Sequence, residues 1–333
     1  MKMYKRISIV GDGAMGTVLA MMFCEKGLDT RIWGYDAAQL QEMESVRENT
    51  RFLPGYALPE SLHFEAVDAR IFVDCDLVVS AIPCQFVRSI WQRLKGVFPG
   101  NLPVVSVAKG IENQTLLRPT EILRDVLGES NQYAVLSGPT IADELAQKLP
   151  ATACIACHDP ATLQAMQYTF NANWFRVYTN KDLVGVELAG ACKNVIALAA
   201  GAIDGTGAGD NAKAALLTRG LAEISRLGMA CGAKAETFAG LAGLGDLVTT
   251  CISPSGRNRS FGERVGRGQT TDQALSATKS VVEGVATCQS LVNLARQKGV
   301  EMPIAEAVYQ VLFEKKSMQQ VVAGLMGREL KSE

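Results

Sequence analysis

The chain has almost no net charge, few aromatic residues and two histidines, and each shortage excludes a kind of function. Its 333 residues carry 33 Lys and Arg against 34 Asp and Glu, a formal charge of −1. That balance gives no overall basic field for nucleic acid. Aromatic residues, at 6%, are too few for a platform on which bases stack. The two histidines lack ligand spacing, so we expect neither a nucleic-acid partner nor a bound metal.

Long apolar runs and an export signal are also missing. No stretch of about 18 or more apolar residues is free of charge, so we expect no helix inserted in a membrane. Met1–Arg6 leads directly into a short apolar run and then glycines, unlike a signal peptide. The nine cysteines form no disulfide-like framework, so we expect reduced thiols and a cytoplasmic location.

One cysteine spacing has the form of a covalent haem attachment site, Cys154-Ile-Ala-Cys157-His158. Such attachment requires export, and the surrounding Thr152–Ala156 is a run of small apolar residues. We therefore expect a buried strand here, with a redox-active cysteine pair as the alternative.

The pattern of apolar residues changes near Asn180 and predicts two domains, at residues 1–180 and 181–333. In the first, short apolar runs alternate with helical periodicity, which is typical of a parallel sheet covered on both faces. The expected strands are Arg6–Val10, Thr30–Trp33, Leu77–Ile82, Val104–Ala108, Tyr133–Leu136 and Thr152–Ala156, with helices at Met15–Lys26, Gln85–Leu94 and Leu116–Leu127. The second domain has expected helices at Val184–Ile203, Ala212–Gly228, Thr271–Ala277, Val285–Lys298, Ile304–Phe313 and Met318–Gly324. We predict a Rossmann-like doubly wound α/β domain followed by an all-α domain.

A glycine-rich turn joins the first expected strand to the first expected helix. The sequence Gly11-Asp-Gly13-Ala-Met-Gly16 has the G-x-G-x-x-G spacing in the strand–turn–helix context that a dinucleotide site requires. The first glycine makes the tight turn, the second lets the backbone approach a pyrophosphate, and the third lets helix and strand pack closely. The helix N-terminus attracts the anion. The pattern indicates a dinucleotide cofactor.

The end of the second expected strand, where the cofactor's ribose is usually recognised, lacks the acid that favours NAD. A carboxylate is expected near Trp33 or Gly34, and Asp36 lies two positions later. Without that carboxylate a 2′-phosphate is not excluded, although no arginine stands at the matching position. The residues therefore leave NADP and NAD open.

Two other expected strands end in unusual residues, and ligands of open parallel sheets bind beyond such ends. Val104–Ala108 runs into Lys109, and Tyr133–Leu136 runs into Ser137-Gly138-Pro139-Thr140. Lys109 is either a solvated turn lysine or a donor to a substrate or cofactor oxygen.

A second lysine stands in an unusually apolar helix. Lys193 is the one charged residue between Leu188 and Ile203. Burial of an ammonium is costly and lowers the pKa of a lysine, which can make it a base near neutral pH. The alternative is a lysine whose long side chain reaches out to solvent.

Ten of the 31 glycines lie between residues 201 and 245, from the end of this helix onward. We expect close helix packing there. Shortly afterwards, Arg257-Asn258-Arg259 follows a turn of Ser, Pro and Gly and precedes an expected helix. That arrangement suits a phosphate clamp, or else a charged surface turn.

Together these residues resemble the NAD(P)-dependent glycerol-3-phosphate dehydrogenases, and the bacterial type most closely. The resemblance runs along essentially the whole chain. Its markers are Gly11–Gly16, Trp33–Asp36, Ala108–Gly110, Ser137–Thr140, Lys193-Asn194, Thr218–Glu223, Gly243–Leu247, Arg257–Arg259 and Val281–Gly284.

The resemblance implies a role for individual residues. Lys193 corresponds to the proton acceptor, and Lys109 and Asp246 complete the catalytic set. Cofactor-binding positions are Gly11, Gly13, Ala14, Met15, Gly16, Tyr35, Lys109, Ala142, Arg257, Val281 and Glu283. Substrate-binding positions are Lys109, Gly138, Thr140, Lys193, Asp246, Gly256, Arg257 and Asn258. The chain departs from the family's pattern at Gly256, where Ser is usual, and at Ala14, Met15 and Tyr35, where Ser, an aromatic residue and His are frequent.

The implied reaction transfers a hydride between C2 of glycerol 3-phosphate and C4 of a nicotinamide, with dihydroxyacetone phosphate as the oxidised product. The cofactor is NADP or NAD, and NADPH is favoured for reduction. Lys193 would take or return the proton, Lys109 would stabilise the developing charge on oxygen, and Asp246 would hold the lysine or a hydroxyl. The resemblance also implies a site in the cleft between the domains, a homodimer and a supply of glycerol 3-phosphate for phospholipid synthesis.

Two other functions stay open. A dehydrogenase of the 3-hydroxyacid or 6-phosphogluconate type shares the same two-domain layout. A non-catalytic dinucleotide sensor would need the glycine turn, but it would have no use for Lys109, Lys193 and the Arg257 clamp together.

Overall fold

The computed structural model describes residues 3–278 and 281–330, which form two compact units. The first unit comprises the described residues up to Lys109 together with Leu117–Glu187, and the second comprises Gly110–Leu116 and the described residues from Leu188 on. The units therefore change at Glu187, whereas the apolar pattern placed the boundary near Asn180.

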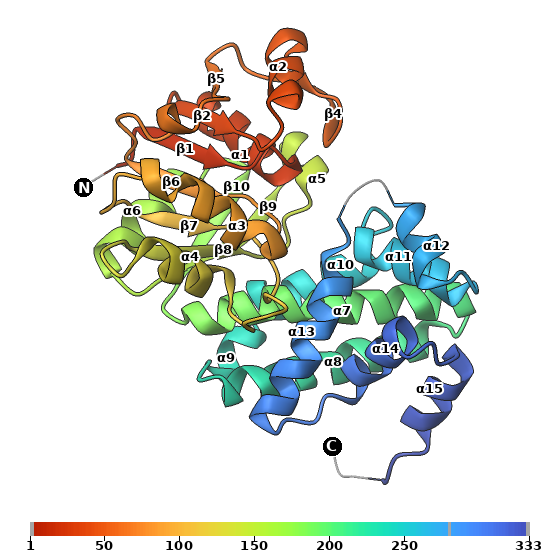
Figure 1. Ribbon diagram of the computed structural model, residues 1–333. Coiled ribbons are helices and arrows are strands. Elements are labelled where there is room, and N and C mark those ends of the chain that lie inside the picture. Colours follow the sequence, from red (N-terminus) through yellow and green to blue (C-terminus); the bar gives the residue numbers. More distant parts are fainter. Residues whose placement is uncertain (1–2, 279–280, 331–333) are drawn as a thin grey trace. The chain divides into compact units, whose positions relative to one another are not determined.

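The first unit is built around an eight-stranded sheet with the strand order β10-β9-β8-β7-β6-β1-β2-β5 (Figure 1). The strands of this sheet are β1 (Arg6–Val10), β2 (Asp29–Trp33), β5 (Leu62–Phe64), β6 (Leu77–Ser80), β7 (Val104–Ser106), β8 (Tyr133–Ser137), β9 (Ala151–Cys157) and β10 (Phe175–Asn180). A separate antiparallel pair consists of β3 (Glu48–Asn49) and β4 (Leu53–Ala57). The six strands expected from the sequence are all present, and β5 and β10 extend the sheet at its two edges.

One strand pair departs from the expected parallel sheet. Strands β8 and β9 are antiparallel, whereas the other neighbouring pairs are parallel. The link between β8 and β9 contains one short helix, α5 (Ala142–Ala146). A helix of this length rises about 7 Å, roughly half the length of a five-residue strand. It does not carry the chain back to the end of the sheet at which β8 began, so β9 starts at the end where β8 finished and runs antiparallel to it.

Helices cover both faces of the sheet, as expected for a doubly wound fold. Apolar residues of α1 (Ala14–Glu25), α2 (Ala37–Val46) and α6 (Pro160–Phe170) share one core with one face of the strands. Residues of α3 (Cys84–Leu94) and α4 (Pro119–Leu127) share the second core with the other face. Two single turns, η1 (Asp68–Arg70) and η2 (Lys95–Val97), complete the unit.

The second unit is helical, as predicted. Its helices are α7 (Leu183–Thr206, which begins in the first unit), α8 (Asp210–Ala230), α9 (Ala235–Phe238), the π-helical turn η3 (Leu241–Gly245), α10 (Asp246–Ile252), α11 (Arg257–Gly266), α12 (Thr271–Ser276), α13 (Glu283–Lys298), α14 (Pro303–Phe313) and α15 (Met318–Met326). By length and composition α7 could cross a membrane, but 89% of its most apolar window is buried inside the protein. It is a core helix.

Glycines allow α7 and α11 to touch along their backbones. A Cβ atom at Gly201 or Gly205 would overlap main-chain atoms of α11, and one at Gly262 or Gly266 would overlap main-chain atoms of α7. Each helix therefore presents two glycines four residues apart, on one face. Gly201 and Gly205 belong to the glycine-rich stretch 201–245, where close helix packing was expected.

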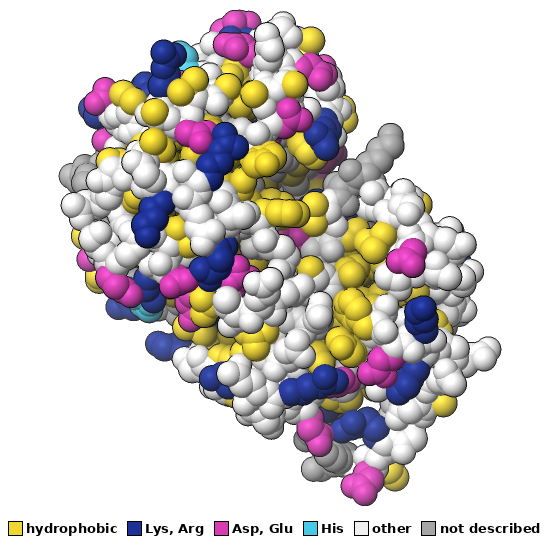
Figure 2. All heavy atoms as spheres, viewed as in Figure 1, with side chains coloured by type: hydrophobic (Ala, Val, Ile, Leu, Met, Phe, Trp, Pro, Cys, Tyr) yellow, Lys and Arg dark blue, Asp and Glu magenta, His cyan; other side chains and the backbone are white. Residues whose placement is uncertain are grey.

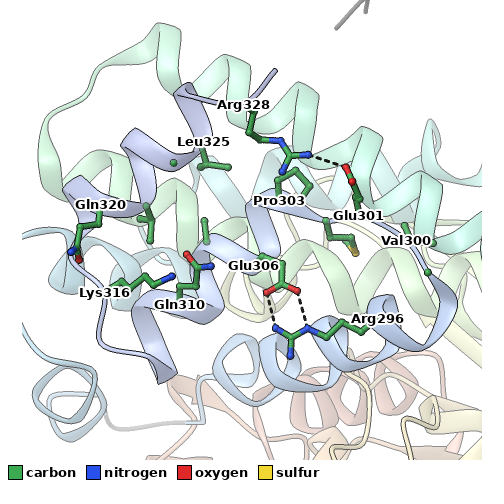
Figure 3. A pocket seen from close by; sticks show the side chains of 15 residues that line it. Arg296, Val300, Glu301, Pro303, Glu306, Gln310, Lys316, Gln320, Leu325 and Arg328 are labelled. Carbon is green, nitrogen blue, oxygen red and sulfur yellow. Dashed lines mark hydrogen bonds and ion pairs between the residues drawn. The ribbon is translucent and has the colours of Figure 1, made fainter. Parts of the chain in front are cut away.

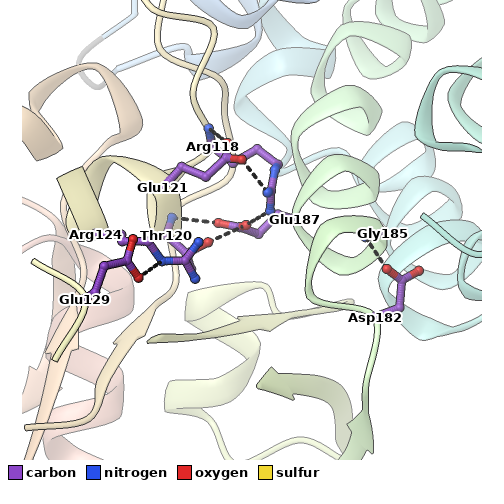
Figure 4. A network of polar contacts seen from close by, with 8 residues as sticks. All are labelled: Arg118, Thr120, Glu121, Arg124, Glu129, Asp182, Gly185 and Glu187. Carbon is purple, nitrogen blue, oxygen red and sulfur yellow. Dashed lines mark hydrogen bonds and ion pairs between the residues drawn. The ribbon is translucent and has the colours of Figure 1, made fainter. Parts of the chain in front are cut away.

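Polar residues of the first unit fix the beginning of α7 (Figure 4). The carboxylate of Asp182 accepts a hydrogen bond from the Gly185 N–H at 2.9 Å. Glu187, whose side chain is almost completely buried, accepts the Thr120 N–H at 2.8 Å and pairs with the Arg118 guanidinium. Burial raises the pKa of Glu187, while Arg118 opposes that shift. The first turn of α7 is thus tied to the start of α4.

The cysteine spacing that matched a haem site lies in β9, as the strand prediction required. Cys154 and Cys157 are buried free thiols. Residues three apart in a strand point to opposite faces of the sheet, so the two sulfur atoms do not form a pair. Burial raises the pKa of Cys154 to about 11, which keeps this thiol protonated.

Candidate active site

The glycine turn has the geometry that a dinucleotide pyrophosphate requires. Gly11 has φ +120°, and a Cβ atom there would lie 2.5 Å from the Ala81 carbonyl oxygen. A Cβ atom at Gly16 would overlap the Gly11 carbonyl, whereas one at Gly13 would meet nothing within 4 Å. Space is therefore open at the middle glycine and closed at the other two, which matches their three expected roles.

The beginning of α1 provides the anion-binding end of that turn. Gly13 is the N-cap of α1, and within the described residues no side chain caps it and no acid stands in the first turn. The first-turn N–H groups and the helix dipole attract a phosphate. Ala14 and Met15 form this turn and pack partly against the core. The residues present fit a dinucleotide.

The end of β2 is surrounded by charges that the sequence alone did not bring together. Gly34 lies against the Asp12 carboxylate, because a Cβ atom there would be 2.7 Å from Asp12 Cγ. Asp36 caps α2 by accepting the Ala38 N–H at 3.0 Å, and Arg51 Nη1 is 4.0 Å from its other oxygen. Burial raises the pKa of Asp12, and the Arg51 charge opposes the shift.

The predicted cofactor residue Tyr35 is exposed at this same end. Its ring lies under the guanidinium of Arg93 at 5.4 Å, and Arg93 also stacks on the Trp33 ring at 5.1 Å. Two hydrogen bonds at 2.7 and 2.9 Å fix Arg93 on Asp68. Two arginines therefore lie near the end of β2: Arg93 comes from α3, and Arg51 comes from the segment between β3 and β4.

Lys109 is positioned by the end of the neighbouring strand. It is half-buried, and its Nζ donates to the Gly138 carbonyl at 2.9 Å. Gly138 has φ +147°, and a Cβ atom there would lie 2.9 Å from Ala153 Cα. The Thr140 hydroxyl donates to the same carbonyl at 3.1 Å, and Ala142 begins α5. The structure thus brings together Lys109, Gly138 and Thr140 within the first unit.

Lys193 is buried in the second unit and is held by a carboxylate. Its Nζ lies 2.6 Å from Asp246 Oδ1, and Lys193 and Asp246 are 6% and 2% exposed. The hydroxyl of Thr250 also contacts Lys193 and lies 3.3 Å from Asp246 Oδ1. The prediction of a buried lysine is confirmed, and the solvent-reaching alternative is wrong.

The π-helical turn η3 brings Asp246 to this position. A Cβ atom at Gly243 would overlap the main chain at Phe238, so the turn requires a glycine there. Asp246 begins α10 directly after η3, and Thr250 lies one helical turn later on the same face. Thr250 is not among the predicted site residues, although its spacing of four residues from Asp246 was a usable signal.

The predicted phosphate clamp lies at the start of α11. Gly256 is the N-cap, and within the described part of the chain this helix end has no side-chain cap and no acid in its first turn. Arg257 is exposed and donates to the Val281 carbonyl at 3.2 Å. Glu283 begins α13 shortly afterwards. The structure therefore groups Gly256, Arg257 and Val281.

Asn258 and Arg259 have structural partners. The Asn258 amide donates to Asn194 Oδ1 at 3.0 Å and accepts the Gly284 N–H at 3.0 Å, which ties α11 to α7 and α13. Arg259 pairs with Asp204 at 2.7 Å. Asn258 has one further amide N–H for a ligand, whereas Arg259 is engaged by Asp204.

A hollow in the second unit lies apart from the predicted site residues. A hollow of about 670 Å³ lies among α13, α14 and α15, where Arg296 pairs with Glu306 and Arg328 with Glu301 (Figure 3). None of the predicted site residues lines it. Figure 2 shows cationic and anionic side chains interspersed over the face in view. Among the described residues, no group of His, Cys, Asp or Glu is arranged to hold a metal.

A Rossmann-type sheet with an open glycine turn, followed by a helical unit that buries a lysine–aspartate pair, defines a nicotinamide-dependent dehydrogenase with two units. Family models for the N-terminal and C-terminal parts of NAD-dependent glycerol-3-phosphate dehydrogenase match residues 6–163 and 182–323. This chain belongs to that family.

Individual relatives match over their whole length. The glycerol-3-phosphate dehydrogenase [NAD(P)+] of Geobacter sp. (strain M21) is 45% identical, with 99% of each chain covered. That of Corynebacterium diphtheriae is also 45% identical, covering 98% of this chain and 100% of the relative. The crystal structure of glycerol-3-phosphate dehydrogenase from Coxiella burnetii has a TM-score of 0.94 at 35% identity, covering 97% of this chain and 99% of that one.

Proposed function

We propose that this protein catalyses the reversible, NAD(P)-dependent interconversion of glycerol 3-phosphate and dihydroxyacetone phosphate. The buried pair of Lys193 and Asp246, in an otherwise apolar helix core, is the observation that carries the proposal. Burying two charges is expensive, and a structural core has no need of them. A reaction that moves a proton on a substrate oxygen does need such a pair.

The cofactor, when bound, supplies or accepts the hydride at C4 of its nicotinamide. Gly11, Gly13, Gly16 and the first turn of α1 would hold its pyrophosphate, and the further cofactor contacts are Ala14, Met15, Tyr35, Lys109, Ala142, Arg257, Val281 and Glu283. These assignments rest on the open turn and the uncapped helix end, together with the family's pattern.

The protein's own residues handle the proton and the phosphate. Lys193 Nζ takes the proton of the C2 hydroxyl during oxidation and returns it to the carbonyl oxygen during reduction. Asp246, in contact with that nitrogen, stabilises the charged lysine while it holds the proton. Lys109 Nζ donates to the substrate oxygen as charge develops there.

The phosphate is gripped at the start of α11. The N–H groups after Gly256, the Arg257 guanidinium and the remaining N–H of Asn258 provide donors there. A Cβ at Gly256 would lie 3.1 Å from the Thr250 carbonyl oxygen, so a side chain at this position would crowd the backbone. Gly138 and Thr140 complete the substrate contacts.

We further propose NADPH as the preferred reductant. Asp36 already accepts N–H groups of α2, so this carboxylate is less able to bind a ribose hydroxyl. Arg51 and Arg93 place two guanidinium groups around the end of β2. A 2′-phosphate carries negative charge that such groups attract.

A cytoplasmic location, a homodimer and a role in phospholipid synthesis complete the proposal. Nine free thiols, most of them buried, suit a reducing compartment. Light scattering coupled to size-exclusion chromatography tests the dimer.

Steady-state kinetics tests the function directly. Purified protein is supplied with dihydroxyacetone phosphate and NADPH or NADH. Separate assays offer 3-keto acids with the same reduced cofactors, and 6-phosphogluconate with NADP+ or NAD+. Turnover of dihydroxyacetone phosphate with a lower KM for NADPH is the expected result. Turnover of a 3-keto acid alone would assign the chain to another dehydrogenase class, and cofactor binding without any turnover would indicate a sensor.

A further inference from the structure

We propose that Asn49 is a positioning residue that sets the orientation of the cofactor-binding turn. It lies in β3, outside the main sheet, and its side chain is completely buried. Its amide Nδ2 donates to the carbonyl of Asp12 at 2.8 Å, inside the Gly11–Gly16 turn, and to the Thr17 hydroxyl of α1 at 2.8 Å. The inference rests on the proposed cofactor use and adds a residue to it.

The Asn49 amide uses its full hydrogen-bonding capacity. Its Oδ1 accepts the Phe52 N–H at 3.1 Å and the Gln39 Nε2 at 3.4 Å. Two donor bonds and two acceptor bonds leave the side chain a single orientation. The β3–β4 segment is thereby fastened to α2 on one side and to the glycine turn on the other.

Fixing the Asp12 carbonyl also fixes the N–H that follows it. In a trans peptide the carbonyl of one residue and the N–H of the next point in opposite directions. Because Asn49 holds the Asp12 carbonyl, the Gly13 N–H points away from Asn49. The side chain of Thr17 supports the same carbonyl with a hydrogen bond of 3.3 Å.

A glycine has no side chain to limit its rotation, so a glycine turn needs an external restraint. Gly13 has open space around its Cα, and the first turn of α1 has no side-chain cap within the described residues. Without Asn49 the Asp12–Gly13 peptide could rotate, and pyrophosphate binding would have to restore its orientation at a cost in affinity. Asn49 removes that cost before the cofactor arrives.

The test compares cofactor affinity in the variants Asn49→Asp and Thr17→Val. Asn49→Asp keeps the size of the side chain and removes both donors, and Thr17→Val removes the hydroxyl that links Asn49 to the turn. We expect the Kd of NADPH and of NADH, from the quenching or enhancement of nicotinamide fluorescence, to rise about ten- to a hundredfold in Asn49→Asp. Both cofactors change together because both carry the pyrophosphate. In Thr17→Val the Kd of both cofactors rises by a smaller factor. In Thr17→Ser, which keeps the hydroxyl, the Kd equals that of the wild type.

Asn131→Asp is the matched control. Asn131 is a buried asparagine of the same unit that donates to the Leu127 carbonyl and to the Tyr133 hydroxyl, and accepts the Leu102 N–H. Asn131→Asp loses a hydrogen-bond network comparable to that lost in Asn49→Asp. If the effect of both changes is only structural, the melting temperature falls by a similar amount in both variants. The Kd of the folded protein rises for Asn49→Asp and stays at the wild-type value for Asn131→Asp.

The outcomes separate the two proposals. If folded Asn49→Asp and Thr17→Val both bind the cofactors like wild type, the positioning role is wrong. If Asn49→Asp fails to fold, Thr17→Val against Thr17→Ser decides alone. Failure of the wild-type protein to bind either cofactor would instead overturn the proposed function. A rise in the KM for dihydroxyacetone phosphate at saturating cofactor, with an unchanged cofactor Kd, also contradicts the positioning role.

Discussion

Lys193 and Asp246 form an ion pair of 2.6 Å in the interior of the second unit, one from the middle of α7 and the other from the first residue of α10. Each charge makes the burial of the other tolerable. A buried pair of this kind adds little net stability compared with apolar residues of the same size. Its presence is therefore best explained by chemistry, and the pair gives rise to two separate predictions.

The first concerns turnover. Lys193→Ala should lose most of its activity with dihydroxyacetone phosphate, by about two to four orders of magnitude, because a general acid–base group typically contributes that much. The Kd of the cofactor should stay near the wild-type value, since the glycine turn is in the first unit. Steady-state kinetics and fluorescence titration measure the two quantities. The exposed Lys181→Ala is the control, and near-normal turnover in Lys193→Ala would sink the assignment of the base.

The second prediction concerns stability. Removing one member, in Asp246→Leu or Lys193→Met, takes the opposite charge away from the one that stays buried and should lower the free energy of unfolding by about 3–5 kcal/mol. The double variant removes both charges and should recover most of that loss, although it stays inactive. Urea unfolding of the wild type, both single variants and the double variant measures the coupling. Additive losses in the double variant would show that the two side chains do not interact.

Much of this fold could be predicted from the sequence because its elements carry strong local signals. The strand Arg6–Val10 is predicted by its continuous run of apolar residues, and β1 has the predicted bounds. The turn at Gly11–Gly16 is predicted by the spacing of its glycines. The edge strand β10 was missed because Phe175–Asn180 alternates buried and exposed residues over a short stretch. The antiparallel pairing of β9 depends on the short connection through α5, which a pattern of apolar residues does not reveal.

The site was predictable only where one segment carries it. Lys193 could be recognised from its own helix, because a single charge among small apolar residues is informative. Asn49 and Arg51 could not be recognised from the sequence. The fold brings Asn49 into contact with Asp12 and Thr17, and it brings Arg51 close to Asp36. Sequence spacing does not record such contacts between distant segments.

The position of Arg51 leads to a prediction about cofactor preference. Arg51→Gln should raise the Kd of NADPH about tenfold or more, because a hydrogen bond between charged groups contributes about 1.5–3 kcal/mol. The Kd of NADH should change less than about twofold, because that cofactor has no 2′-phosphate for the guanidinium. Fluorescence titration with both cofactors gives the ratio.

Arg176→Gln provides a control for the loss of one positive charge, since Arg176 is exposed on β10, at the opposite edge of the sheet. An equal change for NADPH and NADH in Arg51→Gln would mean that Arg51 does not discriminate between them. If the Kd of neither cofactor changes in Arg51→Gln, the 2′-phosphate does not bind at Arg51.

The last prediction concerns the pH dependence of stability and rests on Glu223 of α8. Its buried carboxylate accepts the Ile304 N–H at 2.9 Å, at the start of α14, yet burial raises its pKa from the usual 4.5 to about 7. Because the folded-state pKa exceeds that of the unfolded chain, the folded state binds the proton more tightly. Its contribution to stability is therefore complete below about pH 4.5 and is lost as the pH rises through about 7.

Glu223→Gln keeps an oxygen that can accept the Ile304 N–H and removes the titration. The free energy of unfolding of the wild type should fall relative to that of Glu223→Gln as the pH rises from about 5 to 8. The interval between 4.5 and about 7 corresponds to a fall of about 3 kcal/mol, at about 1.4 kcal/mol per pH unit. Urea unfolding across this pH range measures the difference. Parallel pH profiles for the two proteins would show that Glu223 has the same affinity for its proton in the folded and unfolded states.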